Sequence, residues 1–171
     1  MVSTRNIVLV GFMGTGKSTI GKKLADQLGW NFQDSDAFVE QQQQTSIADM
    51  FREQGEAFFR KLESQALENL LAGEGQVVAT GGGAVLAEAN RTCMLSNGLV
   101  VALTATAEII IQRVQSDQSR PLLQGNLEER VHTLMEQRRH AYDFAHLTID
   151  TSALSTDEIA AKIIEHAGLL N

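Results

Sequence analysis

One stretch of this sequence decides its fold: Gly11-Phe12-Met13-Gly14-Thr15-Gly16-Lys17-Ser18. Two glycines five positions apart, followed by Lys and Ser, form the pattern of a phosphate-binding loop. The apolar run Ile7–Val10 precedes it, and apolar residues recur every four positions from Ile20 to Leu28 after it. A strand therefore enters the loop and a helix leaves it, so that backbone N–H groups can surround phosphate oxygens. Lys17 can then reach the outer phosphates, and the Ser18 hydroxyl can bind Mg²⁺.

Outward from this loop, short aliphatic runs alternate with stretches of helical periodicity. Runs rich in Val, Ile and Leu are typical of strands that are buried on both faces of a parallel sheet. The pattern predicts five strands, at Ile7–Val10, Trp30–Phe32, Val77–Thr80, Leu99–Leu103 and Leu147–Ile149. Helix starts are indicated at Ser46, Asn126 and Ser155, each followed three residues later by an acidic residue. The alternation predicts a three-layer α/β domain with helices on both sheet faces.

Composition limits the class of protein. The 171 residues, 43% hydrophobic and 20% charged, fit a single domain with a buried core. The net charge of −7 argues against non-specific binding to nucleic acid or to an acidic membrane, and no apolar run approaches the ~20 residues of a membrane span. The only cysteine, Cys93, cannot form an intrachain disulfide and fits a reducing compartment. We therefore expect a cytoplasmic protein without nucleic-acid or membrane partners, and take a monomer as the default oligomeric state.

Two segments break the alternation of strands and helices. Residues Asp34 to about Leu62 form a long, mostly helical insertion between the second and third predicted strands. Residues Gln115 to about Gly125 are polar and contain the only proline, within Arg120-Pro121-Leu122-Leu123. A loop of this length is typical of either a mobile lid or a disordered connection.

Polar and glycine-rich groups follow two of the predicted strands. Asp34-Ser35-Asp36 follows the second strand and Gly81-Gly82-Gly83 the third, at the edge where the phosphate loop also lies. One aspartate can lie near the water shell of a metal, and the other can accept a hydrogen bond from an attacking hydroxyl. The glycines allow a ligand to approach the backbone closely. Alone, the aspartates also fit a helix cap or a turn, and the glycines also fit a flexible turn.

An Arg–Glu pair lies on one predicted helix, at the point where the insertion ends. Arg60 follows the apolar position Phe59, and Glu63 lies three residues further on the same helix surface, where it can hold the guanidinium. Taken alone, the pair also fits a routine surface ion pair.

Together these motifs resemble the shikimate kinase family, small P-loop kinases that phosphorylate the 3-hydroxyl of shikimate with ATP and Mg²⁺. The resemblance runs from the phosphate loop to Arg138 and includes, in order, GFMGTGKST, DSD, FFRKLE around Arg60, TGGGAV, RPLL and the arginine of MEQRR. It implies a three-layer P-loop kinase fold whose five-stranded parallel sheet has the order 2-3-1-4-5. Residues 34–62 would form a substrate-binding subdomain of this single domain (1–171), and residues 115–125 would lie within a lid.

The resemblance also implies an activity and a nucleotide site. The products would be shikimate 3-phosphate and ADP, in aromatic amino acid (chorismate) biosynthesis. Within the nucleotide site, Lys17 and Arg120 would be catalytic, Arg113 would stack near the adenine, and Mg²⁺ would be held by Ser18 and, through water, by Asp34. The residues implied to bind ATP are Gly14, Thr15, Gly16, Lys17, Ser18, Thr19, Arg113 and Arg120.

The same resemblance implies how shikimate is bound. Asp36 would orient or deprotonate the attacking hydroxyl as a catalytic residue, and Glu63 would support Arg60 from behind. The implied shikimate-binding residues are Asp36, Arg60, Gly81, Gly82, Gly83 and Arg138, the two arginines holding the carboxylate. Arg139 beside Arg138 leaves a one-residue ambiguity. The stretch Thr151–Leu154 departs from the basic or polar residue that the family often places near the adenine.

Two other functions stay open at this point. One is a P-loop kinase for another small hydroxy acid such as gluconate, and the other is a nucleotide-dependent binding module that has lost catalysis.

Overall fold

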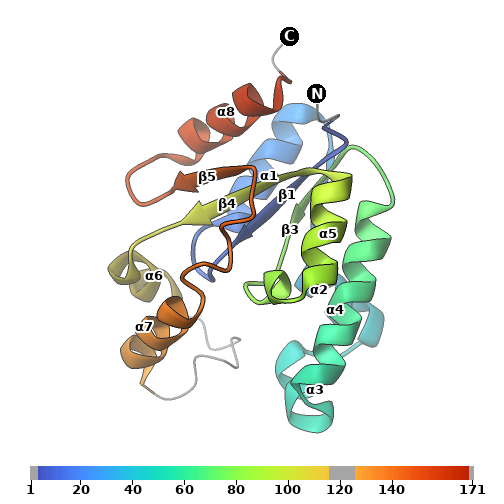
Figure 1. Ribbon diagram of the computed structural model, residues 1–171, viewed down its shortest axis with the longest axis vertical. Coiled ribbons are helices and arrows are strands. Elements are labelled where there is room, and N and C mark those ends of the chain that lie inside the picture. Colours follow the sequence, from blue (N-terminus) through green and yellow to red (C-terminus); the bar gives the residue numbers. More distant parts are fainter. Residues whose placement is uncertain (1–3, 116–125, 170–171) are drawn as a thin grey trace.

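The computed structural model describes residues 4–115 and 126–169, and it places one parallel sheet between two layers of helices (Figure 1). The strands are β1 (Asn6–Gly11), β2 (Asn31–Asp34), β3 (Gln76–Ala79), β4 (Leu99–Thr104) and β5 (Leu147–Asp150). The helices are α1 (Lys17–Leu28), α2 (Ser35–Gln43), α3 (Ile47–Gln54), α4 (Glu56–Leu71), the 3₁₀ turn η1 (Ala84–Leu86), α5 (Glu88–Asn97), α6 (Ala107–Val114), α7 (Leu127–Gln137) and α8 (Thr156–Ala167). No helix within the described residues is long and apolar enough to cross a membrane.

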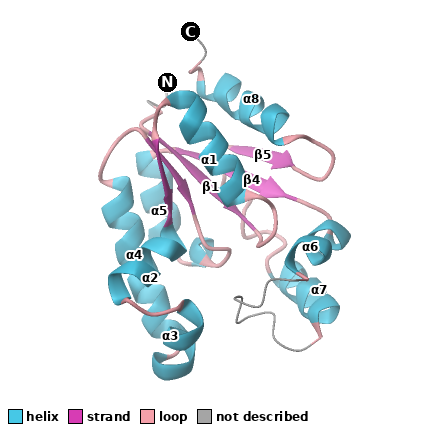
Figure 2. Cartoon of the chain, turned by 180° about the vertical axis from the view of Figure 1, so that it is seen from behind, coloured by secondary structure: helices cyan, strands magenta, loops and turns pink. Residues whose placement is uncertain are grey.

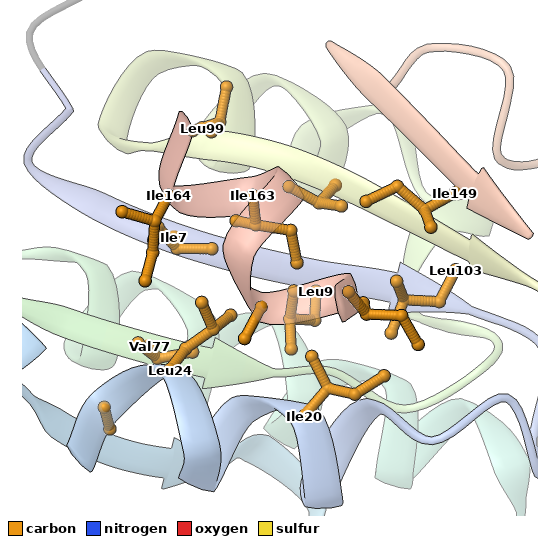
Figure 3. Packing of buried hydrophobic residues seen from close by; sticks show 14 residues of the cluster. Ile7, Leu9, Ile20, Leu24, Val77, Leu99, Leu103, Ile149, Ile163 and Ile164 are labelled. Atoms are coloured by element: carbon orange, nitrogen blue, oxygen red, sulfur yellow. The ribbon is translucent and has the colours of Figure 1, made fainter. Parts of the chain in front are cut away.

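The strand order is β2-β3-β1-β4-β5 and every neighbouring pair is parallel, which confirms the predicted order. The central strand β1 shows why the strands are aliphatic throughout, since successive side chains point to opposite faces of the sheet. Ile7 and Leu9 pack with α1 and α8, as Figure 3 shows, whereas Val8 and Val10 pack with α4 and α5. Both faces of β1 are therefore buried, and a view from behind shows the two helical layers (Figure 2).

Two groups of helices stand beside the carboxyl edge of the sheet. Helices α6 and α7 pack through Ile110, Val114 and Val131 onto Phe12 and Met13 of the phosphate loop. On the other side, α2, α3 and α4 share a separate apolar cluster of Val39, Met50, Phe59 and Ala66. The loop that follows β1 therefore lies between two separately packed walls (Figure 1).

Three helix starts were predicted correctly from their capping side chains. Ser46, Asn126 and Ser155 each accept a hydrogen bond from the backbone N–H three residues on, as the capping pattern indicates. The element bounds are less accurate.

Several predicted strand bounds differ from the structure by one or two residues. β2 begins after Trp30, and β3 ends one residue before Thr80. The predicted substrate-binding subdomain, residues 34–62, would end within α4, whose apolar stripe continues to Leu71, and its bounds stay a prediction. Residues 116–125, which contain most of the predicted lid, lie outside the described residues, so the lid stays a prediction.

Candidate active site

The phosphate loop connects the end of β1 to the start of α1 and closes on itself through hydrogen bonds. Gly14 and Gly16 have φ values of 78° and 98°, in the left-handed region that favours glycine. The Thr15 hydroxyl donates to the Phe12 carbonyl oxygen at 2.8 Å. The Lys17 ammonium donates to the carbonyl oxygens of Gly11 (2.8 Å) and Phe12 (2.9 Å), which holds the lysine over the loop.

Asp34 serves two purposes at the end of β2. Its Oδ1 accepts hydrogen bonds from the amides of Asp36 (3.0 Å) and Ala37 (3.1 Å), which caps α2. Its Oδ2 accepts a hydrogen bond from the Ser18 hydroxyl at 2.9 Å. The cap and a role near a metal are thus compatible. A hydroxyl and a carboxylate side by side are the hard oxygen donors that Mg²⁺ prefers, with water and phosphate as its other ligands, so these residues fit the ion.

The glycine run after β3 makes room for charged side chains. A Cβ atom on Gly81 would lie 2.7 Å from Asp36 Oδ1, and one on Gly83 would lie 2.4 Å from Arg60 Nη2. One on Gly82 would lie 3.3 Å from Arg138 Nη1. These three glycines do not adopt left-handed φ values, so close approach and not backbone conformation is what requires glycine. We expected them to admit a ligand; they also admit three side chains of the site.

Arg60 and Glu63 form the predicted pair on α4. Arg60 Nη1 donates to both Glu63 carboxylate oxygens, at 3.0 and 3.1 Å, and Arg60 Nη2 lies 3.2 Å from Glu56 Oε1. The Glu63 side chain is only 1% exposed. Burial raises the pKa of Glu63 to about 7, even though the Arg60 guanidinium opposes the shift. Glu63 is therefore a buried partner that holds Arg60 in place, and the two residues do not form a routine surface ion pair.

Arg138 lies in the wall of the site, at the end of α7. It is 7% exposed, whereas the Arg139 side chain is 65% exposed and approaches Glu136 at 3.6 Å. Burial thus distinguishes the two arginines, since Arg138 lines the cavity and Arg139 faces solvent. The Tyr142 hydroxyl donates to the Gly82 carbonyl oxygen at 2.8 Å, which fastens the segment after α7 to the glycine run. Burial raises the pKa of the Tyr142 hydroxyl, so it keeps its proton and donates.

A single cavity of ≈ 440 Å³ joins the phosphate loop to these charged groups. It is lined by Lys17, Ser18, Asp34, Asp36, Arg60, Glu63, the three glycines and Arg138, together with apolar side chains of the insertion such as Phe51 and Phe59. Burial raises the pKa of Asp36 to about 6, and the charge of Asp34 adds to the shift, while Lys17 and Arg60 oppose it.

Two buried polar atoms of the cavity walls have no hydrogen-bond partner among the described residues. They are Asp36 Oδ1, an acceptor, and Arg138 Nη1, a donor. Because buried polar atoms are nearly always paired, these two need a donor and an acceptor from water or from a bound molecule.

Most of the predicted site residues line the cavity, and two of those that the structure describes, Thr15 and Arg113, do not. Thr15 is 1% exposed and is buried within the loop. Arg113 donates to the Gly14 carbonyl oxygen at 2.9 Å without lining the cavity, so its place beside an adenine stays a prediction. Arg120 lies outside the described residues.

Sequence reasoning missed two residues that hold the site together. Tyr142 contacts the glycine run, and Thr151 contacts the phosphate loop through its hydroxyl, 3.0 Å from the Thr15 carbonyl oxygen. A signal for Thr151 was available, because it directly follows β5 and so lies at the same carboxyl edge as the other site residues. Tyr142 gave a weaker signal, as the only tyrosine, four residues after Arg138.

Comparison with known proteins agrees with this geometry. The family model described as shikimate kinase matches residues 13–167. The shikimate kinase of Geobacter sulfurreducens is 48% identical over 160 residues, which cover 93% of this chain and 88% of the relative. A solved structure of shikimate kinase from Acinetobacter baumannii in complex with shikimate is 38% identical, has a TM-score of 0.92, and is matched over 96% of this chain and 93% of that one.

A gluconokinase from Sinorhizobium meliloti 1021 is more distant. It is 18% identical with a TM-score of 0.62, over 98% of this chain and 93% of that one, a likeness that shows a shared fold alone. By the family model and the full-length relatives, this chain belongs to the shikimate kinase family.

Proposed function

We propose that this protein transfers the γ-phosphate of ATP to the 3-hydroxyl of shikimate, giving shikimate 3-phosphate and ADP in aromatic amino acid biosynthesis. One observation carries the proposal: the cavity that holds the phosphate loop also holds the unpaired atoms Asp36 Oδ1 and Arg138 Nη1. A hydroxylated ring acid supplies a hydroxyl donor to the first and a carboxylate acceptor to the second.

The acceptor half of the site binds the acid and takes its proton. Arg60 and Arg138 approach from α4 and α7, and their planar guanidinium groups match a carboxylate better than ammonium groups do. Asp36 accepts the hydrogen bond of the 3-hydroxyl, and its pKa of about 6 suits a general base. In the transfer, the bond from the γ-phosphorus to ADP breaks and a bond to the hydroxyl oxygen forms. The hydroxyl proton passes to the Asp36 carboxylate.

The nucleotide half binds and neutralises the phosphates. The backbone N–H groups between Gly14 and Thr19 surround phosphate oxygens at the start of α1, and Lys17 donates to the outer phosphates. Mg²⁺, held by Ser18 directly and by Asp34 through water, supplies positive charge to the β- and γ-phosphates when it is bound. The roles of Arg113 near the adenine and of Arg120 over the phosphates are carried over as proposals from the motif resemblance.

We also propose that the protein acts as a monomer in the cytoplasm. The single cysteine, Cys93, supports the compartment, because it fits a reducing environment. Light scattering coupled to size exclusion, at the protein concentrations of the assay, tests the monomer: a mass near 18.6 kDa is expected, and a mass twice that would contradict it.

Coupled ATP consumption against a panel of hydroxy acids tests the proposed reaction. Shikimate should support turnover, gluconate should not, and phosphorus NMR should show one phosphate ester at the 3-position. Activity with gluconate and none with shikimate would favour the rival kinase. A single-turnover mixture with shikimate that forms no ADP would instead indicate a binding module without catalysis.

A further inference from the structure

The phosphate loop is contacted from behind by two side chains that lie far from it in the sequence. Arg113, on α6, donates to the Gly14 carbonyl oxygen at 2.9 Å. Thr151, directly after β5, places its hydroxyl oxygen 3.0 Å from the Thr15 carbonyl oxygen, across a separation of 136 positions. Thr151 and Thr15 are 3% and 1% exposed, and neither lines the cavity. Both carbonyl groups are therefore held on the side of the loop that faces away from the cavity.

The geometry of the peptide group gives these contacts a consequence inside the cavity. The peptide bonds of the described residues are trans, so the C=O and N–H of one peptide point in opposite directions. Because the Thr15 carbonyl points toward Thr151, the N–H of Gly16 points the other way, toward the cavity that Gly16 lines. Successive N–H groups held in this manner form an anion-binding concavity.

This peptide is one that can rotate easily unless something holds it. Gly16 has a φ of 98°, and glycine populates positive and negative φ almost equally, so the peptide before it has little intrinsic preference for one orientation. A rotated Thr15–Gly16 peptide would present a carbonyl oxygen, and not an N–H, to the phosphate. The loop therefore needs a contact that fixes the Thr15 carbonyl.

The Thr151 hydroxyl is suited to supply that contact. The backbone N–H of Thr151 already donates to the Thr104 carbonyl oxygen at 2.8 Å, so Thr151 is anchored to the end of β4 without its side chain. The hydroxyl lies 3.0 Å from both the Thr104 and the Thr15 carbonyl oxygens. Since the Thr104 carbonyl has the backbone donor, the hydroxyl hydrogen is available to Thr15.

We propose that Thr151 is a positioning residue for nucleotide binding, whose buried hydroxyl fixes the Thr15–Gly16 peptide so that the Gly16 N–H faces the phosphates. The inference rests on the proposed use of ATP by this site. It concerns the nucleotide half alone, because the Thr151 hydroxyl contacts the phosphate loop and not Asp36, Arg60 or Arg138.

The test compares Thr151→Val, which keeps the branched shape and removes the hydroxyl, with Thr151→Ser, which keeps the hydroxyl. Thr148→Val, at an exposed position of β5, is the matched control. Calorimetry with ADP and steady-state assays with ATP and shikimate are the measurements. Thr151→Val should weaken ADP binding and raise the KM for ATP about tenfold, with the KM for shikimate within about twofold of the parent value. Thr151→Ser and Thr148→Val should bind ADP like the parent.

Several results would overturn the inference: unchanged ADP binding in Thr151→Val, equal loss for both substrates, or no rescue by serine. Where Thr151→Val is not folded, Thr151→Ala takes its place and must show the same selective loss. The amide resonance of Gly16 gives an independent measure, since its shift on ADP binding should shrink in the valine variant and be restored by serine. ADP binding needs no turnover, so failure of phosphoryl transfer and failure of this inference are distinguishable.

Discussion

The two halves of the cavity are built in different ways. The nucleotide half consists mainly of backbone groups, held in place by hydrogen bonds to the loop's own carbonyls from Lys17, Arg113 and Thr151. The acceptor half consists of buried charged side chains that converge on three glycines. Binding of phosphates by backbone N–H groups tolerates most side-chain substitutions, and it does not depend on pH because these groups do not titrate. We therefore expect single substitutions and pH to affect the acceptor half more strongly than the nucleotide half.

The largest expected effect is that of Asp36→Asn. The amide keeps the size of the side chain but cannot take the hydroxyl proton, so kcat should fall by about 10²–10⁴-fold, while ADP binding stays within about twofold. Steady-state assays and calorimetry measure the two quantities. Asp26→Asn, at an exposed position of α1, is the control that should change neither. A kcat within tenfold of the parent would remove Asp36 from the proton transfer.

Arg138→Ala should raise the KM for shikimate by about 10–100-fold, because a charged hydrogen bond to the carboxylate is lost. The KM for ATP should change much less. Arg139→Ala is the matched control: its side chain is 65% exposed, and its removal should leave both constants near those of the parent. The opposite ranking of the two variants would show that the wrong arginine has been assigned to the carboxylate.

Gly83→Ala tests whether the glycine run makes room for Arg60. An added Cβ would lie 2.4 Å from Arg60 Nη2, so the guanidinium must move away from its place in the cavity. We expect the KM for shikimate to rise about tenfold, with the KM for ATP nearly constant. Equal KM values for shikimate in the variant and the parent would show that Arg60 has room to shift without cost to binding.

A shift in pH dependence is the smallest expected effect. The pKa of Asp36 is raised to about 6, so the carboxyl keeps its proton below that pH and cannot accept another. The value of kcat/KM for shikimate should therefore fall as the pH drops through about 6. The pKa of Glu63 is raised to about 7, so Glu63 is largely protonated at the pH where Asp36 titrates. Glu63→Gln should therefore leave the limb near pH 6 almost in place and remove the separate titration of Glu63 near pH 7.

Glu68→Gln, at an exposed position of the same helix, is the control and should leave the whole profile unchanged. A profile for Glu63→Gln that coincides with that of the parent near pH 7 would show that the titration of Glu63 does not affect kcat/KM for shikimate.

The two halves also differ in how far the sequence predicts them. The phosphate loop is specified by eight consecutive residues, and its position follows from the strand before it and the helix after it. Asp36 and the glycine run were placed correctly by one rule, that the carboxyl ends of parallel strands share an edge. Local spacing also predicted the contact of Arg60 with Glu63, three residues apart on one helix.

Contacts between distant segments were not predictable in the same way. The hydrogen bond from Thr151 to Thr15 depends on the register of β5 beside β4, and that from Tyr142 to Gly82 on the path of the chain after α7. The choice between Arg138 and Arg139 depends on which side chain is buried, a matter of packing that adjacent positions in the sequence do not decide.

A crystal structure with shikimate and a non-hydrolysable ATP analogue tests most directly that the two halves act on one pair of substrates. The carboxylate should lie between Arg60 and Arg138, and the 3-hydroxyl should hydrogen-bond to Asp36 while facing the terminal phosphate beside Lys17. A structure in which the acid occupies a different crevice, or in which Asp36 and the arginines lie remote from the nucleotide, would contradict this account.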